Sequence, residues 1–264
     1  MIQNNQPTPA MTPFGKRAFI TGGSRGLGLA AAEALLEAGC AVAINHHRDV
    51  AKADAEVKRL GERYPGRIHA IDADVAEPAS ARGAVQAAAA LLGGLDILVS
   101  NAGICRFAPF LDITDEEWQR HRAINFDGGF YVGQEAAHVM KDQGTGGRIV
   151  FTTSVGAFRS NATQTHYCAT KGGLQLLALG MALELAQYGI TVNCIAPGWM
   201  HTDINDAASR DRQAVEPWLN AHCPVGRLGA PGDIKSAVRF LTAVESAYVN
   251  GATISVDGGW NAQL

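Results

Sequence analysis

The sequence lacks the features that mark several classes of protein. Its five cysteines are scattered, without the close pairs that zinc sites and small disulfide frameworks require. No apolar run approaches the ~18 residues that span a bilayer. Residues 1 to 13 are polar, with three prolines, unlike a secretory leader. We therefore expect reduced thiols, no metal site, no membrane partner, a cytoplasmic location and a flexible N-terminal tail over residues 1 to 13.

An excess of positive charge is also missing. The formal net charge is -3 and the pI is about 6.2, so the chain has no surplus of positive charge to neutralise the phosphates of a nucleic acid. We expect a small-molecule substrate and no nucleic-acid partner. With 264 residues, 47% of them hydrophobic, the chain is long enough to bury one large core. The simplest organisation is one α/β domain over residues 14 to 264.

The sequence does have a regular alternation of strand-length apolar runs and longer amphipathic stretches, which is typical of βαβ units. This pattern predicts a doubly wound parallel sheet flanked by helices on both faces, with ligands at the carboxyl ends of the strands. The expected strands are Arg17 to Thr21, Cys40 to Asn45, Ile68 to Asp72, Ile97 to Ser100, Arg148 to Thr153, Thr191 to Ile195 and Thr253 to Val256. The expected helices are Leu27 to Ala38, Val50 to Tyr64, Ala79 to Leu92, Asp115 to Met140, Tyr167 to Tyr188 and Pro231 to Leu241. Residues 199 to 227 break the alternation and are interpreted as a substrate-covering lobe.

A glycine-rich turn follows the first expected strand. Gly22, Gly26 and Gly28 allow a tight turn, close approach of a pyrophosphate to the backbone, and close packing of the next helix. The N-terminus of that helix then faces the phosphates. The turn lies between a strand and an alanine-rich helix, and this position favours a dinucleotide site over residues 22 to 28. The alternative is a turn whose glycines serve only the backbone conformation.

The end of the second strand bears on the choice between NAD and NADP. An acidic residue there would hydrogen-bond the ribose 2′-hydroxyl and repel a 2′-phosphate. The strand instead ends in Asn45-His46-His47-Arg48, and Asp49 is interpreted as a cap of the next helix. Arg25 and Arg48 are candidates for a clamp on the 2′-phosphate; the alternative is that both are solvated surface arginines. We predict NADP, with NAD possible.

Tyr167 and Lys171 are four residues apart, with Ser154 thirteen residues upstream of the tyrosine. On a helix this spacing places the phenol and the ammonium on one face, where the cation would lower the tyrosine pKa. A tyrosine tuned in this way acts as an acid or base near neutral pH. The spacing alone also occurs by chance in helices where the tyrosine packs and the lysine is solvated.

From about Lys16 to its C-terminus the chain resembles the short-chain dehydrogenase/reductase family. The motifs, in order, are Thr21-Gly22-x-x-x-Gly26-x-Gly28, Asp74-Val75, Asn101-Ala102-Gly103, Asn125, Ser154, Tyr167-x-x-x-Lys171, and Pro197-Gly198 followed by Thr202. The resemblance implies that Asp74 and Val75 hold the adenine, that Asn101 and Gly103 line the nicotinamide side, and that Thr202 meets the carboxamide or phosphates. The whole expected cofactor site comprises Gly22, Ser24, Arg25, Gly26, Leu27, Gly28, Asn45, His46, Arg48, Asp74, Val75, Asn101, Ala102, Gly103, Tyr167, Lys171, Pro197, Gly198 and Thr202.

The same resemblance implies a catalytic set of four residues. Tyr167 exchanges a proton with the substrate oxygen while hydride moves to or from the nicotinamide. Ser154 hydrogen-bonds that oxygen, and Lys171 lowers the phenol pKa and holds the nicotinamide ribose. Asn125 anchors a water in the proton path from Lys171 to solvent.

The segments Asn101 to Cys105, Gln164 to Tyr167 and Thr202 to Asn205 are similar to those of aldose 1-dehydrogenases, especially the L-rhamnose 1-dehydrogenase type. This implies oxidation of a sugar to its lactone, with Ser154, Gln164, Tyr167 and Asn205 as substrate residues. Gln164 and Asn205 would alternatively cap local backbone.

Two other functions share the same motifs. A 3-oxoacyl-carrier-protein reductase would need a basic patch for its acidic carrier, and the candidates are Arg106, Arg159, Arg210, Arg212 and Arg227. A non-catalytic NADP-binding regulator would keep the fold without turnover. We further expect a homotetramer, because Leu174 to Leu185 is apolar on more than one face; a buried contact within one chain is the alternative.

Overall fold

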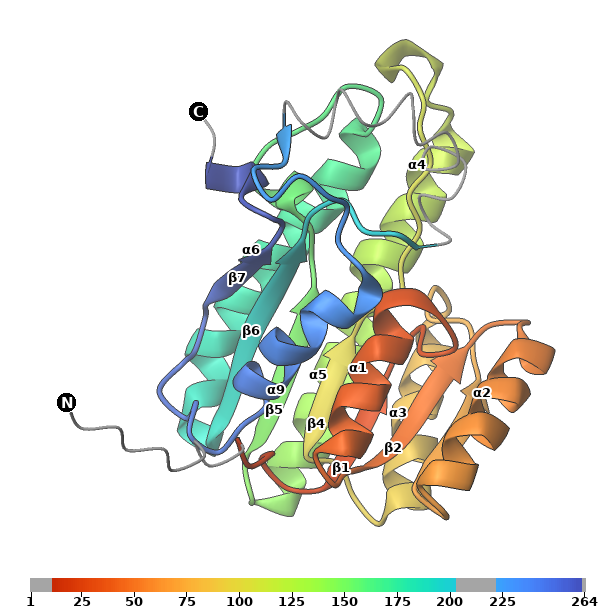
Figure 1. Cartoon of the computed structure of the whole chain (residues 1–264), viewed down its shortest axis with the longest axis vertical. Coiled ribbons are helices and arrows are strands. Elements are labelled where there is room, and N and C mark those ends of the chain that lie inside the picture. The colour runs from red at the N-terminus through yellow and green to blue at the C-terminus, as the bar shows by residue number, and fades with distance from the viewer. Residues whose placement is uncertain (1–10, 203–221, 263–264) are drawn as a thin grey trace.

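Seven parallel strands form the central sheet of the computed structural model, which describes residues 11–202 and 222–262. The strand order is β3-β2-β1-β4-β5-β6-β7. Their bounds are β1 Arg17–Ile20, β2 Ala41–His46, β3 Ile68–Asp72, β4 Ile97–Ser100, β5 Gly147–Thr152, β6 Ile190–Pro197 and β7 Thr253–Val256. The predicted doubly wound α/β fold is confirmed (Figure 1).

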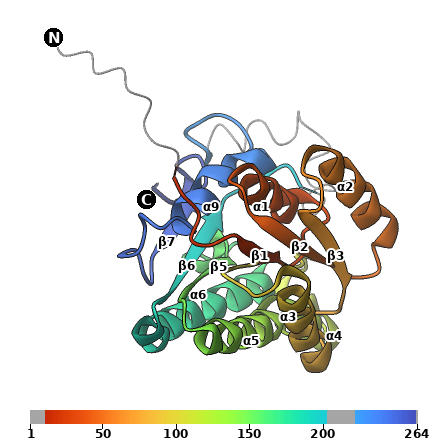
Figure 2. The same cartoon turned by 90° about the horizontal axis from the view of Figure 1, so that it is seen from below.

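Helices cover both faces of the sheet (Figure 2). One face carries α1 (Gly26–Glu37), α2 (Val50–Arg63) and α9 (Lys235–Leu241); the other carries α3 (Pro78–Leu92), α5 (Gly128–Gln143) and α6 (Thr165–Leu185). Each layer has its own apolar core. Leu35 and Val238 pack against one face, while Val132 and Leu174 pack against the other. Burial of apolar surface on both faces explains why strands such as β6 are apolar or buried along their whole length.

The predicted helix from Asp115 to Met140 is wrong as a single element. It consists of α4 (Asp115–His121), a π-helical turn (Arg122–Asp127) and α5. The π turn contains Asn125, whose side chain bonds the backbone of Ile104 and Thr170 Oγ1 instead of facing solvent. Insertion of a residue into a helix in this way commonly marks a functional position.

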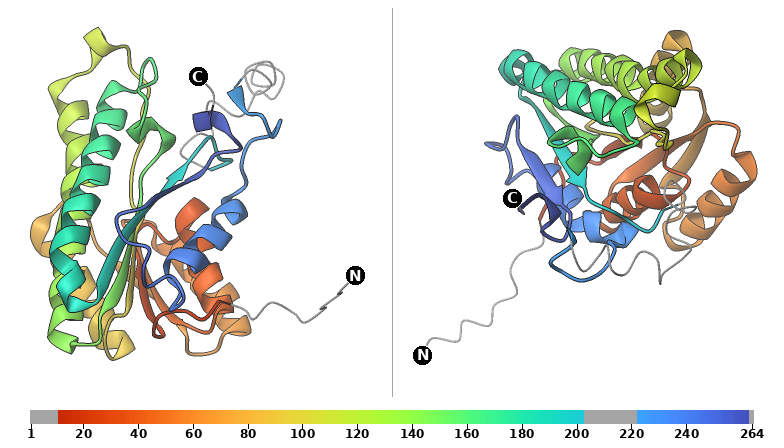
Figure 3. Two further views of the ribbon diagram at one scale, coloured as in Figure 1. Left: turned by 90° about the vertical axis from the view of Figure 1, so that its left-hand side faces the viewer. Right: turned by 90° about the horizontal axis from the view of Figure 1, so that it is seen from above.

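Short 3₁₀ helices are the remaining helical elements of the described residues. They are η1 (Phe110–Asp112), η3 (Val155–Ala157), η4 (Ala186–Tyr188), η5 (Pro231–Ile234) and η6 (Trp260–Ala262). The last of them follows β7, at the same end of the sheet as the loops after the other strands (Figure 3). The C-terminal residues therefore return to the carboxyl ends of the strands.

The described part of the expected tail contacts the domain. Pro13 pairs with Ala243, and the Phe14 N–H donates to the Thr242 carbonyl at 2.7 Å. The Val244 N–H donates to the Thr12 carbonyl at 2.8 Å. Ordered contacts of the domain thus begin by Thr12, slightly before the expected boundary. Within the described ranges, no helix combines the length and apolarity needed to cross a membrane.

Candidate active site

A cavity of about 530 Å³ lies at the carboxyl ends of the strands. Its centre is next to the point between β1 and β4 where the strand order reverses, the usual ligand position in doubly wound sheets. Most of the predicted site residues line it: Gly22, Ser24, Arg25, Gly26, Leu27, Asn45, His46, Asp74, Val75, Asn101, Ala102, Gly103, Ser154, Gln164, Tyr167, Lys171, Pro197, Gly198 and Thr202. Gly28, Arg48 and Asn125 do not line it, and Asn205 lies outside the described residues.

The glycine turn has the geometry that a bound phosphate needs. Gly22 and Gly26 have φ angles of +63° and +54°, which favour glycine. A Cβ on Gly28 would lie 2.1 Å from the Gly22 carbonyl oxygen, so the turn packs directly on α1. Within the described residues, no side-chain hydrogen bond caps the N-terminus of α1, and its first turn carries no acid. The N–H groups at Gly26 and Leu27 thus remain for an anion in the cavity.

Asn101 holds this turn in place. Its side-chain amide donates to the Thr21 and Gly22 carbonyls at 3.1 and 3.3 Å. The Thr21 hydroxyl in return accepts the N–H groups of Asn101 and Ala102 at 2.9 and 3.0 Å. The Asn-Ala-Gly motif therefore joins the loops after β1 and β4, and Gly103 leaves space beside Lys171 Nζ, 3.4 Å from where a Cβ would be.

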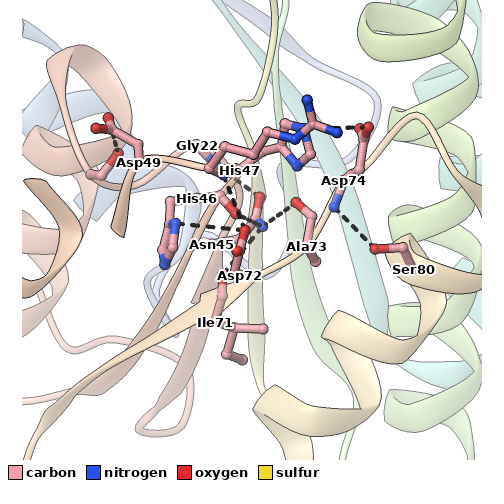
Figure 4. Close-up of polar contacts among 12 residues, drawn as sticks. Gly22, Asn45, His46, His47, Asp49, Ile71, Asp72, Ala73, Asp74 and Ser80 are labelled. Atoms are coloured by element: carbon pink, nitrogen blue, oxygen red, sulfur yellow. Dashed lines mark hydrogen bonds and ion pairs between the residues drawn. The ribbon is translucent and has the colours of Figure 1, made fainter. Parts of the chain in front are cut away.

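The loops after β2 and β3 form the end of the cavity where the adenosine of the cofactor is expected (Figure 4). Asn45 is buried and joins the two strands, because its side-chain amide donates to the His46 and Ala73 carbonyls, both at 2.9 Å. Asp74 Oδ1 accepts the Ala76 N–H at 2.9 Å. The fixed carboxylate of Asp74 remains at the cavity wall.

The predicted arginine clamp is only half present at the cavity. Arg25 lines it, whereas Arg48 does not. Arg48 has a φ of 56°, and its N–H donates to Asp72 Oδ1 at 3.2 Å. Asp49 occupies the N-cap position of α2, as predicted, but its side chain makes no cap hydrogen bond and lines the cavity instead. An acid therefore reaches the cavity although none ends β2.

Tyr167 and Lys171 lie on the first turns of α6, at the other end of the cavity. Lys171 Nζ donates to the Thr152 carbonyl at 2.8 Å and is 5.8 Å from the centroid of the Tyr167 ring. Tyr167 hydrogen-bonds Ser154, which follows β5. The predicted triad is thus one contiguous group.

Burial dominates the pKa values of this group. It raises the Tyr167 pKa far above its ordinary value, and the hydrogen bond with Ser154 opposes this only in part. Burial also lowers the Lys171 pKa to about 8. The predicted lowering of the Tyr167 pKa is therefore wrong for the protein alone, since desolvation and the nearby Cys105 raise this pKa by more than the Ser154 hydrogen bond lowers it.

Asn125 lies behind this group and not in the cavity. Its Oδ1 accepts the Ile104 N–H at 2.8 Å, and its Nδ2 donates to the Ile104 carbonyl at 2.9 Å and to Thr170 Oγ1 at 3.2 Å. These bonds fix the loop that carries Gly103 and Cys105. The water-anchoring role of Asn125 stays a prediction.

The substrate end combines polar and aromatic groups. Gln164 accepts from Asn161 Nδ2 at 3.1 Å and donates to Cys105 Sγ at 3.2 Å, so it binds side chains and does not cap the α6 backbone. Trp199 and Trp260 line the same cavity, with ring centroids 6.5 Å apart. Trp260 comes from η6, so the C-terminal region contributes an aromatic wall.

Comparison with known proteins identifies the scaffold. A family model described as enoyl-(acyl carrier protein) reductase matches residues 22–261. The chain belongs to the short-chain dehydrogenase/reductase family. It is 39% identical to an L-rhamnose 1-dehydrogenase (NAD(P)(+)) of Sphingomonas sp. (strain SKA58), over 95% of this chain and 98% of that protein. It is 36% identical to a 3-oxoacyl-[acyl-carrier-protein] reductase of Salmonella typhimurium, over 93% and 97% of the two chains.

A solved structure agrees with this family membership. A gluconate 5-dehydrogenase from Burkholderia cenocepacia, in complex with NADP and tartrate, superimposes with a TM-score of 0.90 at 38% identity. The match covers 97% of this chain and 98% of that one. The predicted family is confirmed, and the protein is an oxidoreductase of that family.

In this short-chain dehydrogenase/reductase, sequence reasoning missed several cavity residues. They are His47, Asp49, Arg120, Asn161 and Trp260, among others. His47 and Asp49 were visible beside the predicted residues, whereas Asn161 and Trp260 carry no motif of their own. Arg106 pairs with Glu117 at 2.8 Å and Arg227 with Asp233 at 2.6 Å, so these two candidates for a carrier-protein patch have partners within the chain.

Proposed function

We propose that the protein is an NADP-dependent aldose 1-dehydrogenase that oxidises a sugar to its lactone. The observation that carries the proposal is a single cavity joining an uncapped helix N-terminus to the Ser154–Tyr167–Lys171 group. The identity with L-rhamnose 1-dehydrogenase and the NADP named with the gluconate 5-dehydrogenase structure support the cofactor and the sugar class.

The residues present fit a nicotinamide dinucleotide. The N–H groups at the start of α1 suit the pyrophosphate, and the space beside Gly103 suits the nicotinamide ribose next to Lys171. Asp74 and Val75 would hold the adenine, as the family pattern implies. When bound, the oxidised cofactor accepts a hydride from the substrate carbon.

In the oxidation, Ser154 holds the anomeric hydroxyl and Tyr167 accepts its proton. The anomeric C–H electron pair leaves as hydride while the second C–O bond of the lactone forms. Because burial raises the Tyr167 pKa, the phenolate needs nearby positive charge, and Lys171 is the side chain placed to supply it. Lys171 also holds the nicotinamide ribose in this proposal.

The substrate wall suits a sugar ring. The amide chain Asn161–Gln164 supplies donors and acceptors, and Trp199 and Trp260 supply flat faces for the ring C–H groups. Asn205 completes the predicted substrate set, from outside the described residues. Residues 199 to 227 remain a proposed substrate lobe.

An NADP-reduction screen over aldoses and simple alcohols tests this function, with acetoacetyl thioesters assayed by NADPH oxidation. We expect turnover with aldoses and little with thioesters. No reduction with any aldose would contradict the sugar assignment. Turnover of thioesters alone would favour the carrier-protein reductase, which the Salmonella relative and the cavity-lining Arg120 support. No turnover with either would favour the non-catalytic regulator.

We also propose a cytoplasmic homotetramer. Leu176, Leu179 and Leu183 form an exposed apolar stripe on α6, with exposures of 70%, 39% and 83%. Such a stripe is costly to leave in water, so a second copy is its natural partner. Light scattering of the wild type and of Leu183→Glu decides between a tetramer and a monomer.

A further inference from the structure

Two histidines follow each other at the cavity end formed by the loops after β2 and β3. His46 faces Asp72, the last residue of β3, and His47 faces Asp74 in the loop after it (Figure 4). His46 is buried at the end of β2, with Nδ1 3.7 Å from Asp72 Oδ1. The side chain of His47 is 42% exposed, and its Nε2 is 3.6 Å from Asp74 Oδ2. Of these two histidines, His47 is the one that combines a cavity position with the exposure that a ligand contact needs.

We propose that His47 selects between NADP and NAD according to its protonation. The imidazolium binds the 2′-phosphate of NADP, and the neutral ring leaves the site with little preference. The inference rests on the proposed function, because it requires a nicotinamide dinucleotide in this cavity.

The geometry favours His47 over its neighbours. Arg48, predicted together with Arg25 for this contact, lies outside the cavity lining, and its N–H donates to Asp72. Asp74 is fixed through its other oxygen by the Ala76 N–H. An imidazolium at position 47 is therefore held on one side by a fixed carboxylate and is open to the cavity on the other.

The charges around His47 explain why the ring must be protonated to bind the 2′-phosphate. The charged or titratable groups around His47 are Arg25 of the glycine turn, His46 of β2, Arg48 and Asp49 before α2, Asp72 of β3 and Asp74 after it. Three of them are carboxylates. Two of these carboxylates, Asp49 and Asp74, line the cavity and repel a phosphate placed there, and a protonated imidazole offsets part of that repulsion with a charge-assisted hydrogen bond.

The pH dependence that results has a distinctive sign. Histidine ordinarily changes its charge between about pH 5 and pH 8. The 2′-phosphate itself gains negative charge as the pH rises through about 6. A fixed cation therefore binds NADP more tightly as pH rises, whereas a histidine that loses its proton binds it less tightly. A fixed cation and a titrating histidine therefore predict opposite changes of NADP affinity with pH.

The experiment measures Kd for NADPH and for NADH by nicotinamide fluorescence, at about pH 6 and about pH 8 and constant ionic strength. For the wild type we expect the ratio Kd(NADH)/Kd(NADPH) to fall about 10-fold over this interval, the size of one charge-assisted hydrogen bond. In His47→Gln the ratio Kd(NADH)/Kd(NADPH) should be low and independent of pH. In His47→Arg the same ratio should stay constant or rise with pH. Kd for NADH should change little in all three proteins, which controls for folding.

His46→Gln is the matched control, and it should keep the wild-type fall. A constant ratio in the wild type, or a fall that persists in His47→Gln, would overturn the inference. A fall abolished by His46→Gln and not by His47→Gln would overturn it as well. Binding of neither NADPH nor NADH would instead contradict the proposed function itself.

Discussion

Lys171 Nζ donates to the Thr152 carbonyl at 2.8 Å from inside the protein, with only 4% of the residue exposed. No carboxylate pairs with this ammonium among the ion pairs of the described residues. Burial accordingly lowers its pKa from 10.5 to about 8. The lysine is thus held at a cost to stability, which is common for groups whose position serves catalysis.

Lys171→Met should therefore stabilise the cofactor-free protein at neutral pH while abolishing turnover. The pKa shift corresponds to a penalty of up to about 3 kcal/mol. Below about pH 8 both folded and unfolded states carry the charge, so the penalty is constant. Between about pH 8 and pH 10.5 only the unfolded state keeps the charge on this lysine, so wild-type stability rises with pH. The stability difference between Lys171→Met and the wild type therefore becomes smaller.

Chemical denaturation at about pH 7 and about pH 9.5 measures the difference in unfolding free energy between Lys171→Met and the wild type. Lys171→Arg is the control, since it keeps a buried cation and should not stabilise the fold. A Lys171→Met protein less stable than the wild type at neutral pH would show that the lysine contributes to stability.

Tyr167→Phe should reduce turnover to a trace while leaving NADPH binding within about twofold of the wild type, because only the proton-exchanging oxygen is lost. In the wild type, sugar oxidation should accelerate as pH rises above neutrality, since burial raises the tyrosine pKa and the reaction needs the phenolate. The reverse reaction should change little over the same range, because the phenol that it needs stays protonated well above neutrality. Initial rates in both directions, with fluorescence titration of NADPH, provide the measurement. Activity of tens of per cent in Tyr167→Phe would remove the tyrosine from the mechanism.

The parts of this site that the sequence could predict are local. The glycine turn, Asn101-Ala102-Gly103 and Tyr167/Lys171 each lie at the end of a strand or on one helical face, so spacing alone places them. Asn161 and Trp260 reach the same cavity only because distant elements pack together, and no local pattern shows it. The sign of the tyrosine pKa shift failed for the same reason: burial is a property of the whole fold.

Two adjacent buried histidines should respond to mutation with opposite signs. His121 and His166 are both fully buried, with ring centroids 4.0 Å apart. His121 accepts the Arg106 N–H at 3.1 Å and bonds the Glu117 carbonyl at 2.8 Å, which places its proton on Nδ1. Neither ring nitrogen of His166 has a hydrogen-bond partner among the described residues.

His121→Leu should destabilise the fold by about 2 kcal/mol, because it leaves the Arg106 N–H and the Glu117 carbonyl unpaired. Since Arg106 lines the cavity, KM for the sugar should also rise. His166→Leu should be neutral or stabilising by about 1 kcal/mol, because no bond is lost and a buried polar ring is removed. Thermal unfolding of both variants tests this, and equal losses of stability would contradict it.

Acid should unfold the wild type more readily than His166→Leu. Burial lowers the pKa of His166 in the folded protein, so the unfolded state binds its proton more tightly. Above the ordinary histidine pKa of 6.5 neither state is protonated at this ring, and as pH falls below 6.5 the unfolded state takes up the proton first, so the wild type loses stability. The difference in unfolding free energy between the two proteins should widen from about pH 7 to about pH 5. A difference that stays constant over that range would mean that His166 does not titrate on unfolding.

Gly28 and Gly83 offer a matched pair of helical glycines for testing the cofactor turn. A Cβ on Gly28 would lie 2.1 Å from the Gly22 carbonyl oxygen and 2.6 Å from Asn101 Nδ2, so Gly28→Ala must push the turn away from α1. We expect a loss of stability of about 2 kcal/mol and at least a 10-fold weaker binding of both NADPH and NADH. Gly83, within α3, has nothing within 4 Å of its Cβ position, and Gly83→Ala should stabilise the fold by about 0.5 to 1 kcal/mol with unchanged cofactor binding. Because both changes add one methyl group to a helix, a difference between them isolates the contact with the turn. Normal NADPH affinity in Gly28→Ala would show that the close packing of the turn on α1 is not what shapes the pyrophosphate site.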